Sequence, residues 1–144
     1  MTPETKADYE KMIRPLLDFA QRQIREQGAF HPFAAKLSQG ELVLVDAPFE
    51  GPTPYDKIEY LRKVFLAQAT AGAIDACAIA YDGWISQPDG SGRTDAVIIE
   101  CEHRGDEPAD VSIPYGKSRL LGYRFGGWIK SHGAGYVFGP PAAV

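Results

Sequence analysis

Two stretches with the apolar spacing of an α-helix frame the first half of the chain. In the first, apolar side chains recur every three or four residues from Tyr9 to Ile24, with charged residues between them. Thr2 is a suitable N-cap and Gly28 a suitable helix end, so the spacing predicts a helix that stops before Gly28. Pro15 interrupts the pattern. Because the apolar stripe continues past it, we expect one kinked helix rather than two helices.

The second helical stretch starts at Thr53-Pro54, an N-cap followed by proline, and stops at Gly72. Between the two helices, the segments 31–37 and 41–46 flank a Ser-Gln-Gly turn and predict a β-hairpin. Residues 47–54 hold three prolines and a glycine, and they are expected to form a loop.

A long run of β-forming residues from Ile74 to Arg104, broken by turn-forming residues at 87–92, predicts a central antiparallel hairpin. A loop centred on residue 89 sets which residues face each other, whereas a two-residue Asp89-Gly90 turn would shift every pair by one. If the loop is centred on residue 89, one face of the hairpin carries four facing pairs: Cys77 with Cys101, Ile79 with Ile99, Tyr81 with Val97, and Asp75 with His103. The other face is alanine-rich and holds Ala76, Ala78, Ala80, Ala96, Ile98, Glu100 and Glu102.

Short strands are expected to complete the chain. The pattern predicts a strand at 110–113 that ends at Pro114, a turn at 116–118, a strand from Leu120 to Trp128, and a further short strand at 135–138. Residues 139–144 are expected to form a tail.

The sequence therefore predicts one α+β domain over residues 1–144, with the element order α-β-β-α-β-β-β-(β). Helices are too few to cross over between all strands, so we expect a mostly antiparallel sheet of five or six strands with two helices packed on one face. This element order resembles that of profilin-like and roadblock-like domains.

Several local motifs resemble a family of small, uncharacterised bacterial proteins. They are Gly-Ala-Phe-His-Pro-Phe-Ala at 28–34, Ala-x-Ala-x-x-Tyr-Asp ending at 82, the run at 94–104 and Ile-Pro-Tyr at 113–115. The resemblance covers residues 28 to 115. It implies the same fold and transfers no catalytic residue.

Composition narrows the possible functions. Nineteen acidic residues against fifteen Lys and Arg give a net charge of -4, which disfavours nonspecific nucleic-acid binding. No apolar run approaches the roughly 20 residues of a membrane span, the polar N-terminus is unlike a signal peptide, and the two cysteines lack a Cys-x-x-Cys spacing. We expect a cytoplasmic protein with reduced thiols, no cofactor and no membrane association.

Few residues suggest catalysis. Asp75 with His103 could pair a carboxylate with an imidazole, and Glu100 with Glu102 could act as acid/base groups or bind a divalent cation. A surface ion pair and a solvated outer face explain the same residues. The cysteines are best explained as small buried side chains rather than redox groups, and the three histidines match no zinc pattern, so no metal site is predicted.

The C-terminal third is richer in residue types that bind partners. Aromatic and arginine side chains dominate binding hot spots, although the same residues could line a sheet face. The predicted binding residues are Tyr115, Lys117, Arg119, Arg124 and Trp128. We therefore expect a non-enzymatic binding or adaptor module that could serve regulation, with an unknown protein partner or a homodimer across the alanine-rich face. A small enzyme or cation-binding protein that uses Glu100, Glu102 and His103 is the alternative.

Overall fold

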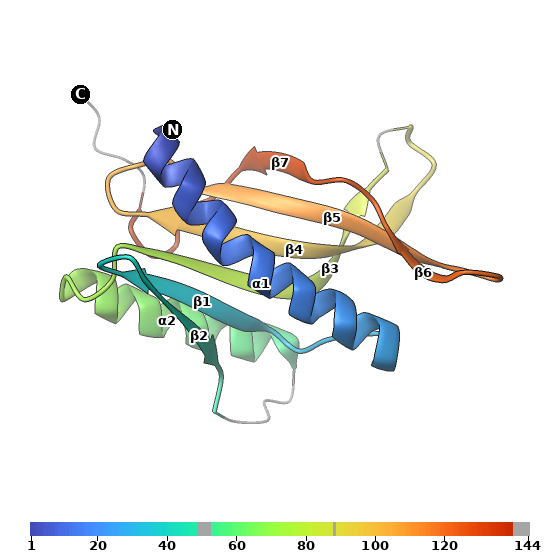
Figure 1. Ribbon diagram of the computed structural model, residues 1–144, viewed down its shortest axis with the longest axis horizontal. Helices are drawn as coiled ribbons and strands as arrows, with labels where there is room; N and C mark the ends of the chain where they lie inside the picture. The colour runs from blue at the N-terminus through green and yellow to red at the C-terminus, as the bar shows by residue number, and fades with distance from the viewer. Residues whose placement is uncertain (49–52, 88, 140–144) are drawn as a thin grey trace.

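The computed structural model describes residues 1–48, 53–87 and 89–139. In these residues two helices accompany a seven-stranded antiparallel sheet with the order β2-β1-β3-β4-β5-β6, in which β7 also pairs with β5 (Figure 1). The elements are α1 (Pro3–Gln27), β1 (Phe33–Ser38), β2 (Glu41–Asp46), α2 (Pro54–Thr70), β3 (Ala76–Ser86), β4 (Arg93–His103), β5 (Ala109–Ser118), β6 (Gly122–Phe125) and β7 (Ile129–His132). The predicted α+β class, antiparallel sheet and element order are confirmed. The sheet has seven strands where we expected five or six.

The two helices cover opposite faces of the sheet, not one face as predicted (Figure 1). Side chains of α1 form one core with Ala78 and Ile99, and side chains of α2 form a second core with Cys77 and Ile79. The central strands are apolar on both faces, as is typical of strands buried on both sides, and this continuous pattern does not show which helix takes which face. The alanine-rich face expected to support a homodimer does not exist as one surface: Ala76, Ala78 and Ala80 lie under α1, whereas Glu100 binds Arg62 of α2 on the opposite side of the sheet.

The register of the central hairpin differs by one residue from the expected pairing. Ser86 faces Arg93 across the turn, so Cys77 faces Glu102 and Cys101 faces Ala78. The shift moves the cysteines to opposite faces of the sheet. The cross-strand thiol pair is therefore wrong, and the register is the one that an Asp89-Gly90 turn would give.

Helix α1 follows its sequence signals closely. The Thr2 hydroxyl accepts a hydrogen bond from the backbone N–H of Thr5, and the helix runs through Pro15 without a break. Gly28 ends it with a φ of 84°, in the left-handed region that glycine adopts without strain. Within the described residues, neither helix is long and apolar enough to span a membrane.

The C-terminal strands have other bounds than the sequence predicted. Strand β5 continues through Pro114 to Ser118, because the proline meets a bulge where its carbonyl accepts a bond from the Gly126 N–H at 2.7 Å. A Cβ on Gly126 would lie 2.9 Å from the Pro114 ring, so glycine is required there. Of the expected strand at 120–128 only 122–125 is a strand, β6; β7 follows at 129–132, where none was predicted, and 135–138 forms no strand. Apart from Gly139, the predicted tail lies outside the described residues, as does 49–52 of the predicted loop.

Candidate functional site

The sheet splits at one end into two diverging hairpins. Strands β4 and β5 pair only as far as Ala96 and Pro114. Beyond that point β4 stays with β3 as far as Ser86, while β5 pairs with β6 from Tyr115 to Ser118. We call residues 115–125 the projecting hairpin and the gap between the two hairpins the cleft; Figure 1 shows the hairpins pointing away from each other.

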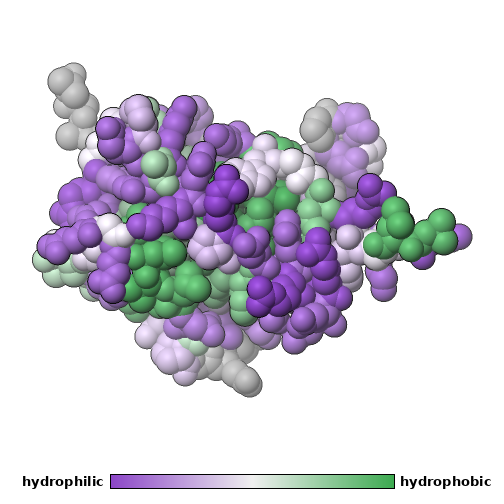
Figure 2. Space-filling view, viewed as in Figure 1, coloured by the Kyte–Doolittle hydropathy of each residue, from purple (hydrophilic) through white to green (hydrophobic). Residues whose placement is uncertain are grey.

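Two adjacent leucines form the end of the projecting hairpin. Leu120 is 92% exposed and Leu121 is 67% exposed, more than any other large hydrophobic side chain of the described residues. Figure 2 shows a hydrophobic patch at the end of the projection, beyond the body of the molecule. Such side chains would normally be buried, so their placement indicates a surface that another molecule covers.

Cations surround the two leucines. Lys117, Arg119 and Arg124 are all exposed on the projecting hairpin. The sequence explains the concentration of charge: none of the nineteen acidic residues follows Asp110, whereas four of the fifteen Lys and Arg do. An acidic protein thus carries a basic end, a charge asymmetry that net charge alone conceals.

Aromatic residues support the inner face of the projecting hairpin. The Tyr115 ring is buried, with its centroid 5.7 Å from that of Phe125. Its hydroxyl donates to the Asp82 carboxylate at 2.6 Å, which ties the hairpin to β3. Burial raises the pKa of Asp82, and the hydrogen bond from Tyr115 acts in the opposite direction. The base of the hairpin is thus held firmly while its end projects into solvent.

The cleft between the hairpins contains two neighbouring hollows, of about 470 and 330 Å³. The guanidinium of Arg93 lies 3.8 Å from the centre of the Trp84 ring, a cation–π contact at one wall. Trp84 is nevertheless 50% exposed. Tyr115 and Arg124 form part of the opposite wall. The cleft therefore combines an open aromatic surface with cations from both hairpins.

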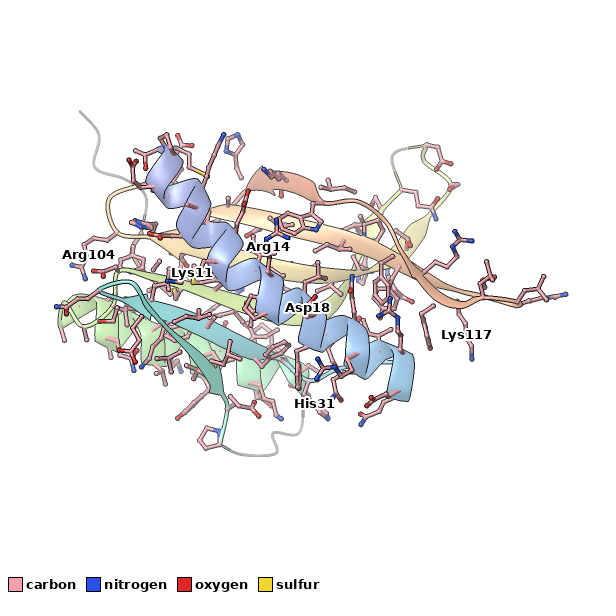
Figure 3. All side chains as sticks on the ribbon, viewed as in Figure 1. Lys11, Arg14, Asp18, His31, Arg104 and Lys117 are labelled. Carbon is pink, nitrogen blue, oxygen red and sulfur yellow. The ribbon has the colours of Figure 1, made fainter. Side chains whose placement is uncertain are left out.

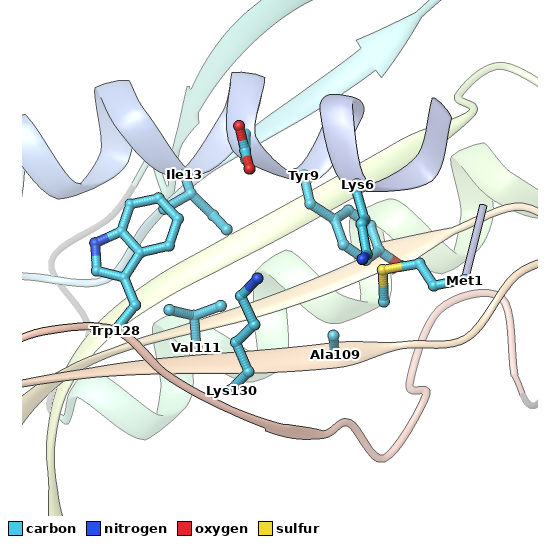
Figure 4. Close-up of a pocket in the computed structure, with 9 residues that line it drawn as sticks. Met1, Lys6, Tyr9, Ile13, Ala109, Val111, Trp128 and Lys130 are labelled. Atoms are coloured by element: carbon cyan, nitrogen blue, oxygen red, sulfur yellow. The ribbon is translucent and has the colours of Figure 1, made fainter. Parts of the chain in front are cut away.

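Trp128, the fifth predicted binding residue, lies away from the projecting hairpin. It lines a small pocket of about 40 Å³ between α1 and strands β5 and β7 (Figure 4), and the Arg14 guanidinium lies 6.0 Å from its ring centre. Figure 3 shows Arg14 on α1 and Lys117 on the projecting hairpin, well apart. Four of the five predicted binding residues are thus grouped on this hairpin, and Trp128 is not.

The expected pair of Asp75 and His103 does not form. The His103 ring nitrogen Nε2 lies 2.9 Å from the Asp8 carboxylate of α1, while Nδ1 lies 3.0 Å from the Arg104 carbonyl. Asp75 instead accepts a hydrogen bond from the Gln39 backbone N–H at 2.8 Å. The one-residue register shift separates the two residues, so they do not act as a base and its orienting partner.

Glu100 and Glu102 are buried on the α2 face, away from His103. Arg62 of α2 binds Glu100 at 2.6 Å, and Tyr81 donates to the same carboxylate at 3.3 Å. Glu102 accepts the backbone N–H groups of residues 136–138 at 2.9 to 3.1 Å. Both carboxylates are saturated by internal partners, and their contacts fasten α2 and the C-terminal segment to the sheet.

Sequence reasoning did not identify several residues of this end of the molecule. Leu120 and Leu121 looked like the start of a strand, whereas they occupy the turn between β5 and β6. Trp84 and Arg93 lie within the predicted central hairpin, but no local pattern marked them as exposed residues at its end. One usable signal was present: the absence of acidic residues after Asp110 indicates a basic surface built from the C-terminal third.

Comparisons of the chain with protein-family profiles, with curated proteins and with solved structures found no match. The resemblance to a family of small bacterial proteins therefore stays a prediction.

Proposed function

We propose that this chain is a non-enzymatic binding module that docks on a partner protein through the projecting hairpin. The observation that carries this proposal is the pair Leu120 and Leu121, 92% and 67% exposed at the end of a hairpin. Burying one leucine contributes about 1.5–3 kcal/mol, so a partner that covers both gains substantial affinity.

The charges around the leucines define the partner. Lys117, Arg119 and Arg124 favour an acidic surface with an apolar depression that receives the leucines. Opposite charges at the rim of an interface mainly accelerate association and make it sensitive to salt. The partner is thus an acidic protein, and the chain acts in the cytoplasm, where its two buried thiols remain reduced.

Affinity capture from the source cell tests the proposal. The bait is the full chain, compared with the double variant L120S/L121S and with L66S, which removes a leucine that is 46% exposed on α2. We expect the wild type and L66S to retain the same acidic protein and the double variant to lose it. Binding should weaken as salt rises and persist after nuclease treatment.

Equal retention by L120S/L121S would reject the projecting hairpin as the docking surface. Loss of the captured protein after nuclease treatment would instead show a nucleic-acid partner and contradict the proposal. Sedimentation at several concentrations measures self-association. If the wild type forms a dimer and L120S/L121S does not, the leucines bind a second copy of the chain and the proposal of an acidic partner is wrong.

A further inference from the structure

The cleft exposes an edge of β5 that no described strand covers. Strands β6 and β7 follow each other along one edge of β5, and β4 covers the other edge only as far as Pro114. Pro114 has no N–H, so its pair with Ala96 is flanked by the Tyr115 N–H, which faces the Asp95 backbone of β4. From Gly116 to Ser118, the edge that faces the cleft is free in the described chain. An unpaired strand edge is a template for another extended segment.

The hydrogen bond at the bulge fixes which backbone groups face the cleft. The Pro114 carbonyl points toward β6, where it accepts the Gly126 N–H at 2.7 Å. Successive residues of a strand direct their backbone groups to alternate edges. Tyr115 and Lys117 therefore direct their N–H and C=O groups toward the β4 side of the strand. Tyr115 does so beside Asp95, at the end of the β4–β5 ladder, whereas Lys117 does so in the open cleft.

The side chains around this edge indicate what kind of segment fits. Trp84 offers a half-exposed ring on one hairpin, and Phe125 lines the hollow on the other. Arg93 and Arg124 line the hollows, and the exposed Lys117 follows Gly116, which lines both; among the described residues, Asp95 is the one acidic residue that lines either hollow. Alternate side chains of an added strand point to opposite faces, so apolar and acidic residues in alternation match both sets of groups.

From this arrangement we infer that the cleft binds an extended peptide segment of alternating apolar and acidic residues, which adds a strand to the free edge of β5 at Lys117. The inference rests on the proposed function and gives it a binding mode: the leucines anchor the partner body, and an extended segment of the partner lies in the cleft. Backbone hydrogen bonds supply affinity in such complexes, and the side chains supply specificity.

A synthetic peptide of about eight residues that alternates glutamate with valine tests the inference. Fluorescence of Trp84, measured in a W128F background so that one tryptophan reports, gives the dissociation constant for the full chain. We expect saturable binding by this peptide and none by its lysine–valine counterpart. Methylation of the peptide's alternate backbone nitrogens should abolish binding, because it removes the donors needed for strand pairing while it keeps the charge.

Lys117 offers a matched pair of variants. Its N–H faces the cleft rather than β6, so K117P removes a free donor and leaves the β5–β6 ladder intact, whereas K117A removes only the charge. We expect K117P to bind the peptide about fivefold more weakly than K117A, the loss of roughly one hydrogen bond. Far-UV circular dichroism confirms that K117P is folded, and the methylated peptide tests the same bond without altering the protein.

Two outcomes would overturn the inference. Equal affinity of the methylated and unmethylated peptides would show that charge alone holds the peptide, without strand addition. Absence of any binding by the glutamate–valine peptide would reject the cleft as a peptide site. The latter result leaves the proposed function standing if L120S/L121S still loses its captured partner, so the two failures are distinguishable.

Discussion

Arg62 and Glu100 form a two-pronged ion pair between α2 and the centre of the sheet. Arg62 Nη2 lies 2.6 Å and 2.9 Å from the two carboxylate oxygens of Glu100, and Nε donates to one of them at 3.2 Å. The Tyr136 ring covers the guanidinium with its centre 3.6 Å away. One contact thus joins helix, strand and C-terminal segment on the α2 face.

We predict that removing one partner of this ion pair destabilises the protein more than removing both charges. R62M leaves Glu100 charged, buried and unpaired, so it should lower the free energy of unfolding by about 3 kcal/mol. The double variant R62M/E100Q should recover part of that loss, since no unpaired charge remains. Urea denaturation at pH 7 measures both values, and equal destabilisation by the single and double variants would contradict the prediction.

Asp110 should make the protein less stable as pH rises. Burial, together with repulsion from Glu100 and Glu102, raises the pKa of Asp110 to about 6. Between about pH 4 and 6, the folded protein therefore holds a proton on Asp110 that the unfolded chain has already released. The stability that this group contributes is fully present below about pH 4 and is lost as pH rises to about 6.

The variant D110N isolates this effect. As pH rises from about 4 to 6, the wild type should lose stability relative to D110N, which carries no titrating group at this position. Above about pH 6 the difference in free energy of unfolding should stay constant. NMR titration of the Asp110 carboxyl carbon gives the pKa directly. A value near the ordinary range for aspartate, about 4, would contradict the prediction.

Glu102 should control the order of the C-terminal segment. Its carboxylate accepts three successive backbone N–H groups, those of Tyr136, Val137 and Phe138. We predict that E102A accelerates hydrogen exchange of these amides and costs about 2 kcal/mol of stability, because hydrogen bonds to a charged group are lost together. E41A, which removes an exposed glutamate from β2, should leave the exchange of these amides unchanged.

Both thiols should be inert in the folded protein. Cys77 and Cys101 are buried, and burial raises the pKa of each thiol above its usual range, so neither forms the reactive thiolate at neutral pH. A thiol-specific chromogenic reagent should therefore label neither cysteine in native protein and both after denaturation. Stoichiometric labelling of native protein within minutes would contradict this prediction.

Local sequence signals predicted the elements well, because caps and turns act within a few residues. Thr2, Gly28 and Thr53 mark helix boundaries that the structure confirms, and the pairing of β1 with β2 follows from a turn at Gln39 and Gly40. These interactions depend on neighbours in sequence, so the sequence alone contains them.

Long-range arrangement was harder to predict, because it depends on small differences between similar surfaces. Both faces of β3 are apolar, and the choice of face for each helix depends on packing that no local pattern encodes. A one-residue shift at the turn then placed His103 beside Asp8 and moved it away from Asp75. The candidate site was the part predicted least well, because residues such as Trp84 and Leu120 are exposed only as a result of the divergence of the two hairpins.

The core beneath α2 includes Val137 together with residues from β1, α2 and β3. During synthesis, the layer under α1 can assemble once β5 has left the ribosome, whereas the α2 layer lacks a wall until residue 137 emerges. A premature stop shortly before residue 137 should therefore yield a protein in which α2 still covers the sheet but its core lacks Val137 on one side, which favours aggregation.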